Sequence, residues 1–233
     1  MNPIPAHSTL TEAEAAALAS PLERAGLPPA VVRGCQTHFG LLRRWNQTHN
    51  LTRITDPAEA AVRHYLDCAL PVFRGPVPTD ASGGSADRAV ADRAIADRGF
   101  ADIGSGAGFP GLIAALVHPA TRATLVEPSR KRASFLRVAA GELGLRDVRV
   151  TDPPTGRGPG YSWVLSRATF SRAVRDELWP YVAPGGVLWA WTTPAEQETW
   201  SGLVRTWGDA HLTWHSYELP GIGERVIATI ART

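Results

Sequence analysis

The chain has 233 residues, a formal net charge of +2 and 44% hydrophobic residues. This length allows one sizeable α/β core with a small helical appendage. Apolar runs of membrane-spanning length and a signal peptide are absent, which predicts a cytoplasmic protein without membrane contact. The two cysteines and seven histidines lack metal-ligand spacing, so we predict no metal site. The small net charge restricts any nucleic-acid binding to a local patch.

The N-terminal region, residues 1–74, is predicted to be helical. Apolar residues recur at helical spacing in three segments. The first covers 9–24, the second begins at Pro28–Pro29, and the third begins at Asp56. Thr9 and Glu12 have capping-box spacing at the start of the first segment, and Asp56 has Glu59 three residues later.

Residues 75–98 have a different composition. The five-residue unit ADRxx occurs three times there, and the stretch is too short and polar to form its own core. We therefore expect a low-complexity linker between the N-terminal helices and a domain covering 99–233.

From residue 99 onward, predicted strands and helices alternate, which indicates a mostly parallel sheet of seven strands with helices on both faces. The strands are expected at 99–103, 122–126, 147–151, 161–166, 186–191, 211–217 and 224–231. Helices are expected at 110–117, 129–143, 170–182 and 194–206. The last two strands have no room for a crossover helix between them, so they must be antiparallel.

The stretch FADIGSGAGFPG, residues 100–111, combines a short apolar strand, closely spaced glycines and a helix start. Glycines allow a ligand to approach the backbone closely, and the helix N-terminus offers free N–H groups. Glu127 ends the next apolar run, 21 residues after Gly106, where an acid can accept hydrogen bonds from ribose hydroxyls. Together these features predict a nucleoside-type cofactor.

The same glycines fit the pattern of a dinucleotide-binding domain, so that alternative has to be weighed. Pro110 cannot donate an N–H where a pyrophosphate needs donors, and the terminal hairpin does not suit a purely parallel nucleotide fold. An S-adenosylmethionine site needs an acid at the end of the first strand for the methionine ammonium, and Asp102 occupies that place. S-adenosylmethionine is therefore the expected cofactor.

Several further motifs resemble those of the RsmG (GidB) family of bacterial methyltransferases. They occur in family order and are W45-N-x-T-H-N-L-T52, R63-H-x-L-D67, D102-I-G-S-G-A-G-F-P-G111, K131-R132 with F135-L136, S166-R-A168, P184-G-G186 and Glu224-Arg225. The resemblance implies a class I, Rossmann-like methyltransferase domain preceded by helices. It also implies methylation of N7 of a guanine in 16S ribosomal RNA, with the RNA, the small subunit or an assembly intermediate as partner. We further expect the protein to be a monomer.

The resemblance and the strand ends together suggest site residues of three kinds. We expect catalytic roles for Arg167 and His64. The expected cofactor-binding residues are Asp102, Gly104, Ser105, Gly106, Gly108, Phe109, Glu127, Asp152 and Arg167. The expected RNA-binding residues are Arg63, Asn50, Arg132 and Arg172.

Simpler structural roles compete with some of these assignments. Arg63 and Asp67 are spaced as an i, i+4 ion pair on one helix, and Asn-rich turns often satisfy their own backbone. The chain also departs from the family where Trp191-Thr192-Thr193 replaces a usual Lys-Gly. We expect most tryptophans to be core residues, and Trp191 is the candidate for stacking on a base. A methyltransferase with another substrate and a non-catalytic RNA-binding or ribosome-assembly protein remain as alternatives.

Overall fold

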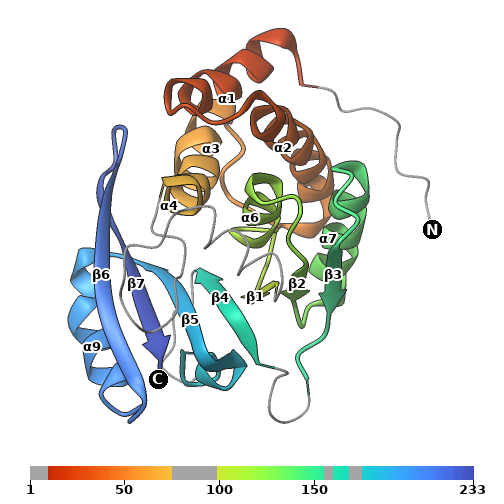
Figure 1. Cartoon of the computed structure of the whole chain (residues 1–233). Coiled ribbons are helices and arrows are strands. Elements are labelled where there is room, and N and C mark those ends of the chain that lie inside the picture. Colours follow the sequence, from red (N-terminus) through yellow and green to blue (C-terminus); the bar gives the residue numbers. More distant parts are fainter. Residues whose placement is uncertain (1–9, 75–98, 155–159, 168–174) are drawn as a thin grey trace.

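The computed structural model describes residues 10–74, 99–154, 160–167 and 175–233, which fold around one seven-stranded sheet (Figure 1). The strands are β1 Phe100–Ile103, β2 Ala123–Val126, β3 Val148–Thr151, β4 Tyr161–Arg167, β5 Val182–Thr192, β6 Ala210–Leu219 and β7 Gly223–Arg232. Their order in the sheet is β3-β2-β1-β4-β5-β7-β6. Strands β1 to β5 pair in parallel, and β7 is antiparallel to both β5 and β6, which confirms the predicted sheet and its terminal hairpin.

Helices lie on both faces of this sheet (Figure 1). They are α1 Glu12–Arg24, α2 Pro29–His49, α3 Pro57–Ala60, α4 Asp67–Arg74, α6 Gly111–Val117, α7 Arg130–Glu142 and α9 Gln197–Val204. A π-helical segment, Ala61–Leu66, joins α3 to α4, and 3-10 turns cover Trp179–Tyr181 and Pro194–Glu196.

The capping box of α1 differs from the predicted one. Thr11 is the N-cap, its side chain accepts from the Glu14 N–H, and the Glu14 carboxylate accepts from the Thr11 N–H at 2.9 Å. The helix thus begins two residues later than a Thr9 and Glu12 box requires, and Thr9 lies outside the described residues. The predicted cap of the third segment is confirmed, because Asp56 Oδ1 accepts from the Glu59 N–H at 2.8 Å.

Two helix predictions in the second half need correction. The predicted helix 170–182 lies partly in residues 168–174, outside the described part, and its end is wrong because residues 179–181 form a 3-10 turn and β5 begins at Val182. The early start of β5 brings the turn Pro184-Gly185-Gly186 into the strand as an irregularity in its register with β4. The predicted helix 194–206 begins as a 3-10 turn and becomes α9 only at Gln197.

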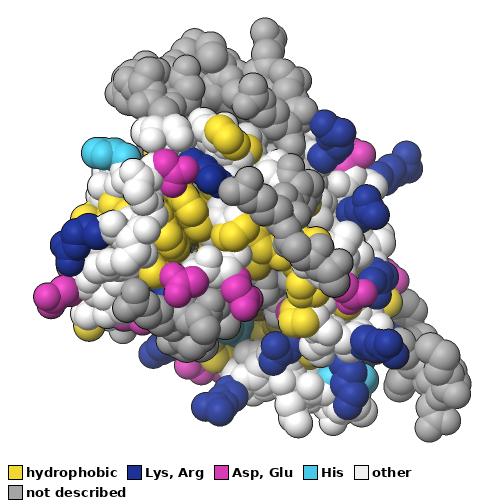
Figure 2. All heavy atoms as spheres, turned by 90° about the horizontal axis from the view of Figure 1, so that it is seen from below, with side chains coloured by type: hydrophobic (Ala, Val, Ile, Leu, Met, Phe, Trp, Pro, Cys, Tyr) yellow, Lys and Arg dark blue, Asp and Glu magenta, His cyan; other side chains and the backbone are white. Residues whose placement is uncertain are grey.

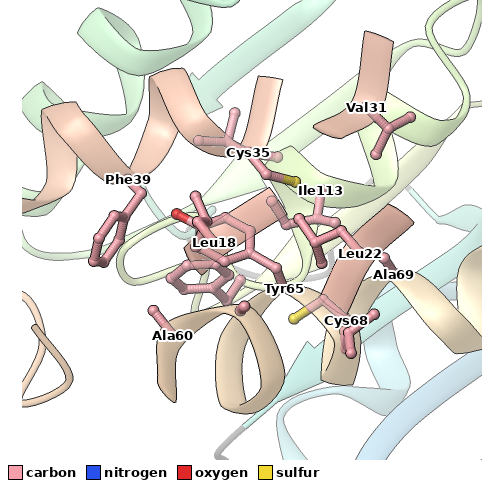
Figure 3. Packing of buried hydrophobic residues seen from close by; sticks show 14 of the residues in the cluster. Leu18, Leu22, Val31, Cys35, Phe39, Ala60, Tyr65, Cys68, Ala69 and Ile113 are labelled. Carbon is pink, nitrogen blue, oxygen red and sulfur yellow. The ribbon is translucent and has the colours of Figure 1, made fainter. Parts of the chain in front are cut away.

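The N-terminal helices share one core with α6 and α7. Leu18 and Leu22 of α1, Cys35 of α2 and Tyr65 of the π-helical segment are fully buried together with Ile113 of α6 (Figure 3). Burial raises the pKa of the free Cys68 thiol in this core to about 12. The N-terminal helices are thus packed directly behind the glycine-rich loop. The predicted linker 75–98 lies outside the described residues.

None of the described helices is both long enough and apolar enough to cross a membrane.

Candidate cofactor and substrate site

The candidate site lies at the carboxyl ends of β1, β2 and β4, where parallel strands of an α/β sheet commonly place ligands. The glycine-rich loop, residues 104–110, leaves β1 and enters α6. Gly104 has a φ of +77° and no atom within 4 Å of the position that a Cβ would occupy. The loop therefore presents open backbone at this point, which is what close approach of a ligand requires.

Asp102 lies beneath this loop and is fully buried. Its Oδ2 accepts from the Gly111 N–H at 3.0 Å, at the start of α6. Its Oδ1 is buried and has no hydrogen-bond partner within the described residues. Burial raises the pKa of this carboxyl from its ordinary value of 3.8 to about 7. A buried acceptor without a donor fits a ligand that brings one, such as an ammonium group.

Glu127 follows β2 and is 2% exposed. Its Oε2 accepts from the Gly106 N–H and its Oε1 from the Ser129 N–H, both at 2.8 Å. The carboxylate therefore holds the glycine loop and the start of α7 together. A carboxylate has about four lone-pair positions, so two of them remain for ribose hydroxyls. Ser105, by contrast, uses its hydroxyl within the loop, where it donates to the Asp102 carbonyl at 2.9 Å.

Phe109 is the centre of an aromatic cluster that ties the loop to the N-terminal helices. The His64 ring stacks on Phe109 with centroids 4.5 Å apart and 21° between the ring planes. His38 and Tyr65 contact the same ring edge-on at 5.1 and 5.3 Å, and the Arg167 guanidinium lies 5.9 Å from its centroid. This packing fixes the last turn of the loop before α6.

His38 also bonds the loop directly, although it comes from α2. Its Nε2 lies 2.9 Å from the Ala107 carbonyl oxygen, and its Nδ1 lies 2.8 Å from the Tyr65 hydroxyl. Because a carbonyl can only accept, Nε2 carries the proton and Nδ1 accepts from Tyr65. Burial lowers the pKa of His38 to about 4, so the ring is neutral and suited to this bridge.

His64 is likewise held in its neutral form. Burial, followed by the nearby Arg167 charge, lowers the pKa of His64 to about 3. Its Nε2 lies 2.9 Å from Thr52 Oγ1, and its Nδ1 is buried without a partner within the described residues.

Asp67 gathers charged groups from distant parts of the chain. It is 1% exposed, and Arg167 Nη2 lies 2.8 Å from its Oδ2 while Arg225 Nε lies 3.3 Å from its Oδ1. The Tyr217 hydroxyl donates to Oδ1 at 2.8 Å, and the Trp191 indole N–H donates to the Asp67 carbonyl at 2.7 Å.

The expected ion pair between Arg63 and Asp67 is therefore wrong. Arg63 instead pairs with Glu59 at 3.1 Å, and both side chains are about half exposed. The i, i+4 argument assumes α-helical geometry, whereas Arg63 lies in the π-helical segment, whose wider turns change the direction of side chains after it. Asp67 consequently faces Arg167 and Arg225.

A cavity of about 170 Å³ opens beside this cluster. It is lined by Ile54, Arg63, Asp67, Arg167, Leu219, Ile222 and Arg225. The two sequence candidates Arg63 and Arg167 are thus brought together, and Arg167 Nη2 donates to the Arg63 carbonyl at 2.7 Å. Trp191 is 4% exposed and bonded to Asp67, so it is a core residue and no platform for a base.

The remaining sequence candidates lie further out. Asn50 ends α2 with a φ of 48° and is exposed. The Asn46 side chain donates to the Thr52 carbonyl and accepts from the Thr52 N–H. Asp152 is exposed after β3, and Arg132 is exposed in the first turn of α7. Arg172 lies outside the described residues.

Three contributors were missed by the sequence reasoning. His38 lies in the apolar stripe of α2, and that placement was the available signal for a buried, bonded histidine. Tyr65 and Tyr217 carried no local signal, because their partners are 27 and 150 residues away. Among the described residues, no group of three His, Cys, Asp or Glu side chains is arranged to hold a metal ion.

Comparison with known proteins places the chain in a family. A family model described as rRNA small subunit methyltransferase G matches residues 86–196. The ribosomal RNA small subunit methyltransferase G of Stenotrophomonas maltophilia (strain K279a) is 32% identical over 224 residues, which cover 93% of this chain and 94% of that protein. The protein of the same name from Solibacter usitatus (strain Ellin6076) is 40% identical over 133 residues, 53% of each chain.

A solved structure supports the fold. The O-methyltransferase NcsB1 from neocarzinostatin biosynthesis, in complex with S-adenosyl-L-homocysteine and 1,4-dihydroxy-2-naphthoic acid, is 13% identical, covers 66% of this chain and 54% of that one, and has a TM-score of 0.50. The predicted class I, Rossmann-like fold of S-adenosylmethionine-dependent methyltransferases is confirmed. The chain belongs to the ribosomal RNA small subunit methyltransferase G family.

Proposed function

We propose that this protein transfers a methyl group from S-adenosylmethionine to N7 of a guanine in 16S ribosomal RNA, within the small subunit or an assembly intermediate. The observation that carries the proposal is the pair of buried carboxylates around the glycine loop. Asp102 keeps one oxygen without a partner, and Glu127 keeps acceptor positions beside the Gly106 N–H. These groups match the ammonium and the ribose hydroxyls of the cofactor.

On the substrate side, the cavity around Asp67 suits an RNA group. Arg63, Arg167 and Arg225 present guanidinium groups that match phosphate or carbonyl oxygens. Arg167 and Arg225 are each paired with Asp67, so part of their charge is balanced before the cationic product forms. We assign Arg167, together with Arg63, to positioning the RNA beside Phe109.

The proposed reaction requires little acid–base chemistry from the protein. When bound, S-adenosylmethionine supplies an electrophilic methyl group; the lone pair of N7 forms the new bond, and the carbon–sulfur bond breaks to leave S-adenosylhomocysteine. The proposed nucleophile carries no proton at neutral pH, so a general base is not required. Residues of the chain contribute by holding the two reactants in line and by excluding water.

His64 fits this chemistry as a positioning residue. Its low pKa keeps it uncharged, and it stacks on Phe109, which places it behind the loop. We propose that His64 supports the loop and neither donates nor accepts a proton in the reaction. The proposed RNA contacts also include Asn50, Arg132 and Arg172. Asp152 is the proposed contact to the adenine of the cofactor, and the proposed oligomeric state is a monomer.

The proposal is tested by mapping N7-methylguanine in 16S RNA from cells with and without the gene, alongside a calorimetric titration of the protein with S-adenosylmethionine. We expect binding, and one N7-methylguanine that disappears with the gene. Binding without any change in the methylation map would favour a methyltransferase with another substrate. Absence of binding would favour the non-catalytic assembly protein.

A further inference from the structure

The side of the sheet formed by α7 and β3 carries more positive charge than the whole chain. Residues 119–154 contain seven Lys and Arg and four Asp and Glu, hence a net charge of +3, while all 233 residues together have +2. One of those four acids, Glu127, is buried beneath the glycine loop and bonded to backbone N–H groups. Figure 2 shows Lys and Arg side chains gathered on the right of its view, the side that holds α7 and β3 in Figure 1.

The basic side chains of α7 extend from the carboxyl ends of the strands toward their amino ends. Helix α7 begins after β2, beside Glu127, and ends before β3. It therefore runs from the site, at the carboxyl ends of the strands, to the amino ends of the strands. Thirteen helical residues span about 20 Å. Arg130 and Arg137 are seven residues apart, which places both on one face of α7. Both are exposed.

Three further arginines continue this surface at the far edge. Arg122, Arg146 and Arg149 line a cavity of about 420 Å³ at the amino ends of the strands, where Asp147 is the one acidic lining residue within the described part. All three arginines are exposed, and within the described residues Arg146 and Arg149 have no ion pair. We name the exposed residues Arg130, Arg137, Arg146 and Arg149 the basic strip.

We propose that the basic strip binds the phosphate backbone of small-subunit ribosomal RNA, so that RNA contact continues from the methyl-transfer site to the opposite edge of the sheet. Guanidinium groups form paired hydrogen bonds with phosphate oxygens. Within the described residues, Arg130, Arg146 and Arg149 have no ion pair, and Arg137 makes only a long contact of 3.5 Å to the Val150 carbonyl. The inference rests on the proposed function, because it takes the small subunit as the partner. It adds a contact that contributes to affinity, while the chemistry takes place at the carboxyl ends of the strands.

Binding measurements with matched variants test this inference. The double variant Arg146→Gln/Arg149→Gln removes two charges at the amino ends of the strands, and Arg205→Gln removes another exposed charge, at the end of α9. We would measure the affinity for small subunits prepared from cells without the gene, at several salt concentrations. Each lost phosphate contact should lower the salt slope of log affinity by about 1, so the double variant should lose about 2.

The expected result is binding at least about tenfold weaker for the double variant at low salt, with unchanged S-adenosylmethionine affinity and unchanged binding by Arg205→Gln. An unaltered salt slope in the double variant, or an equal loss in Arg205→Gln, would overturn the inference. Since binding is read without methyl transfer, a wild-type protein that binds subunits but does not methylate them would fail only the proposed function.

A cross-linking measurement identifies what the strip contacts. A photoreactive maleimide on Arg149→Cys labels that position, because both native cysteines are buried. We expect cross-links to 16S RNA. Cross-links to ribosomal protein alone would show a protein surface as the partner and would contradict the proposal.

Discussion

Asp102 has one oxygen bonded to the Gly111 N–H and the other without a partner, in a fully buried position. The replacement Asp102→Asn keeps the shape and removes the charge that we assign to the methionine ammonium. Because a hydrogen bond to a charged group contributes about 1.5–3 kcal/mol, we expect affinity for S-adenosylmethionine to fall about 10- to 100-fold by calorimetry. Wild-type affinity in this variant would contradict the assignment.

The raised pKa of Asp102 gives this prediction a pH dependence. The folded pKa of about 7 lies above the ordinary value of 3.8, so the folded chain retains the proton longer than the unfolded chain. The free energy of unfolding contributed by Asp102 is therefore present below about pH 4 and lost as the pH rises to 7. Cofactor affinity should rise over the same interval. Asp102→Asn should remove both trends, as pH series of chemical denaturation and calorimetry would show.

His38 is the second residue with a distinct expected effect. His38→Phe leaves the partly buried Ala107 carbonyl and the buried Tyr65 hydroxyl without this partner, and each such group costs about 1–3 kcal/mol. We expect chemical denaturation to show a loss of about 2–4 kcal/mol, together with weaker cofactor binding. Tyr65→Phe is the matched control, since it keeps the bond to the loop. It should lose about 1 kcal/mol and retain cofactor affinity; equal cofactor affinities in the two variants would show that the loop bond is unimportant.

At the scale of elements, the contact between α6 and β1 depends on Gly111. A Cβ there would lie 2.5 Å from Asp102 Oδ2 and 2.5 Å from Leu125 Cδ2, so Gly111→Ala must move the helix start away from β1. We expect a loss of about 1–3 kcal/mol in the free energy of unfolding and weaker cofactor binding. Gly141 in α7 has open space at the same position, and Gly141→Ala should stabilise the protein by about 0.5–1 kcal/mol. Thermal and chemical unfolding of both variants, with calorimetry for cofactor affinity, check this contrast.

The junction between the π-helical segment and α4 places Asp67 against strands β4 and β7. Asp67→Asn leaves Arg167 and Arg225 without their buried counter-charge, which should cost about 3 kcal/mol of stability. We expect methyl transfer to fall while cofactor affinity is kept. Glu59→Gln, which breaks only the exposed pair with Arg63, should change stability by less than about 0.5 kcal/mol. A similar loss of transfer in both variants would refute the role of Asp67.

At the scale of the whole molecule, the sheet and the glycine loop were predictable because their signals are local. Strand alternation, the glycine spacing and Glu127 each lie within a short stretch of sequence. The Asp67 cluster was not predictable, since its partners Arg167, Tyr217 and Arg225 are 100 to 158 residues away. The π-helical turns also altered the face on which Asp67 lies. Helical periodicity predicted the start of α2, although the helix continues to His49 through part of the expected polar turn, and it could not reveal that His38 reaches the loop.

The packing of the whole molecule joins the N-terminal helices to the methyltransferase unit. Their buried residues share a core with α6 and α7, and His38, His64 and Tyr65 all contact the loop residue Phe109. The cofactor loop is therefore shaped from behind by residues more than forty positions earlier in the chain.

Methyl transfer to guanine N7 of small-subunit RNA can be tested by reconstitution with purified components. Small subunits from cells without the gene would be incubated with the protein and methyl-labelled S-adenosylmethionine, and the labelled nucleoside identified by mass spectrometry. We expect N7-methylguanine at one site of 16S RNA, formed by the wild type and greatly reduced with Asp102→Asn. A different methylated nucleoside, or no transfer by a protein that binds both the cofactor and the subunits, would contradict it.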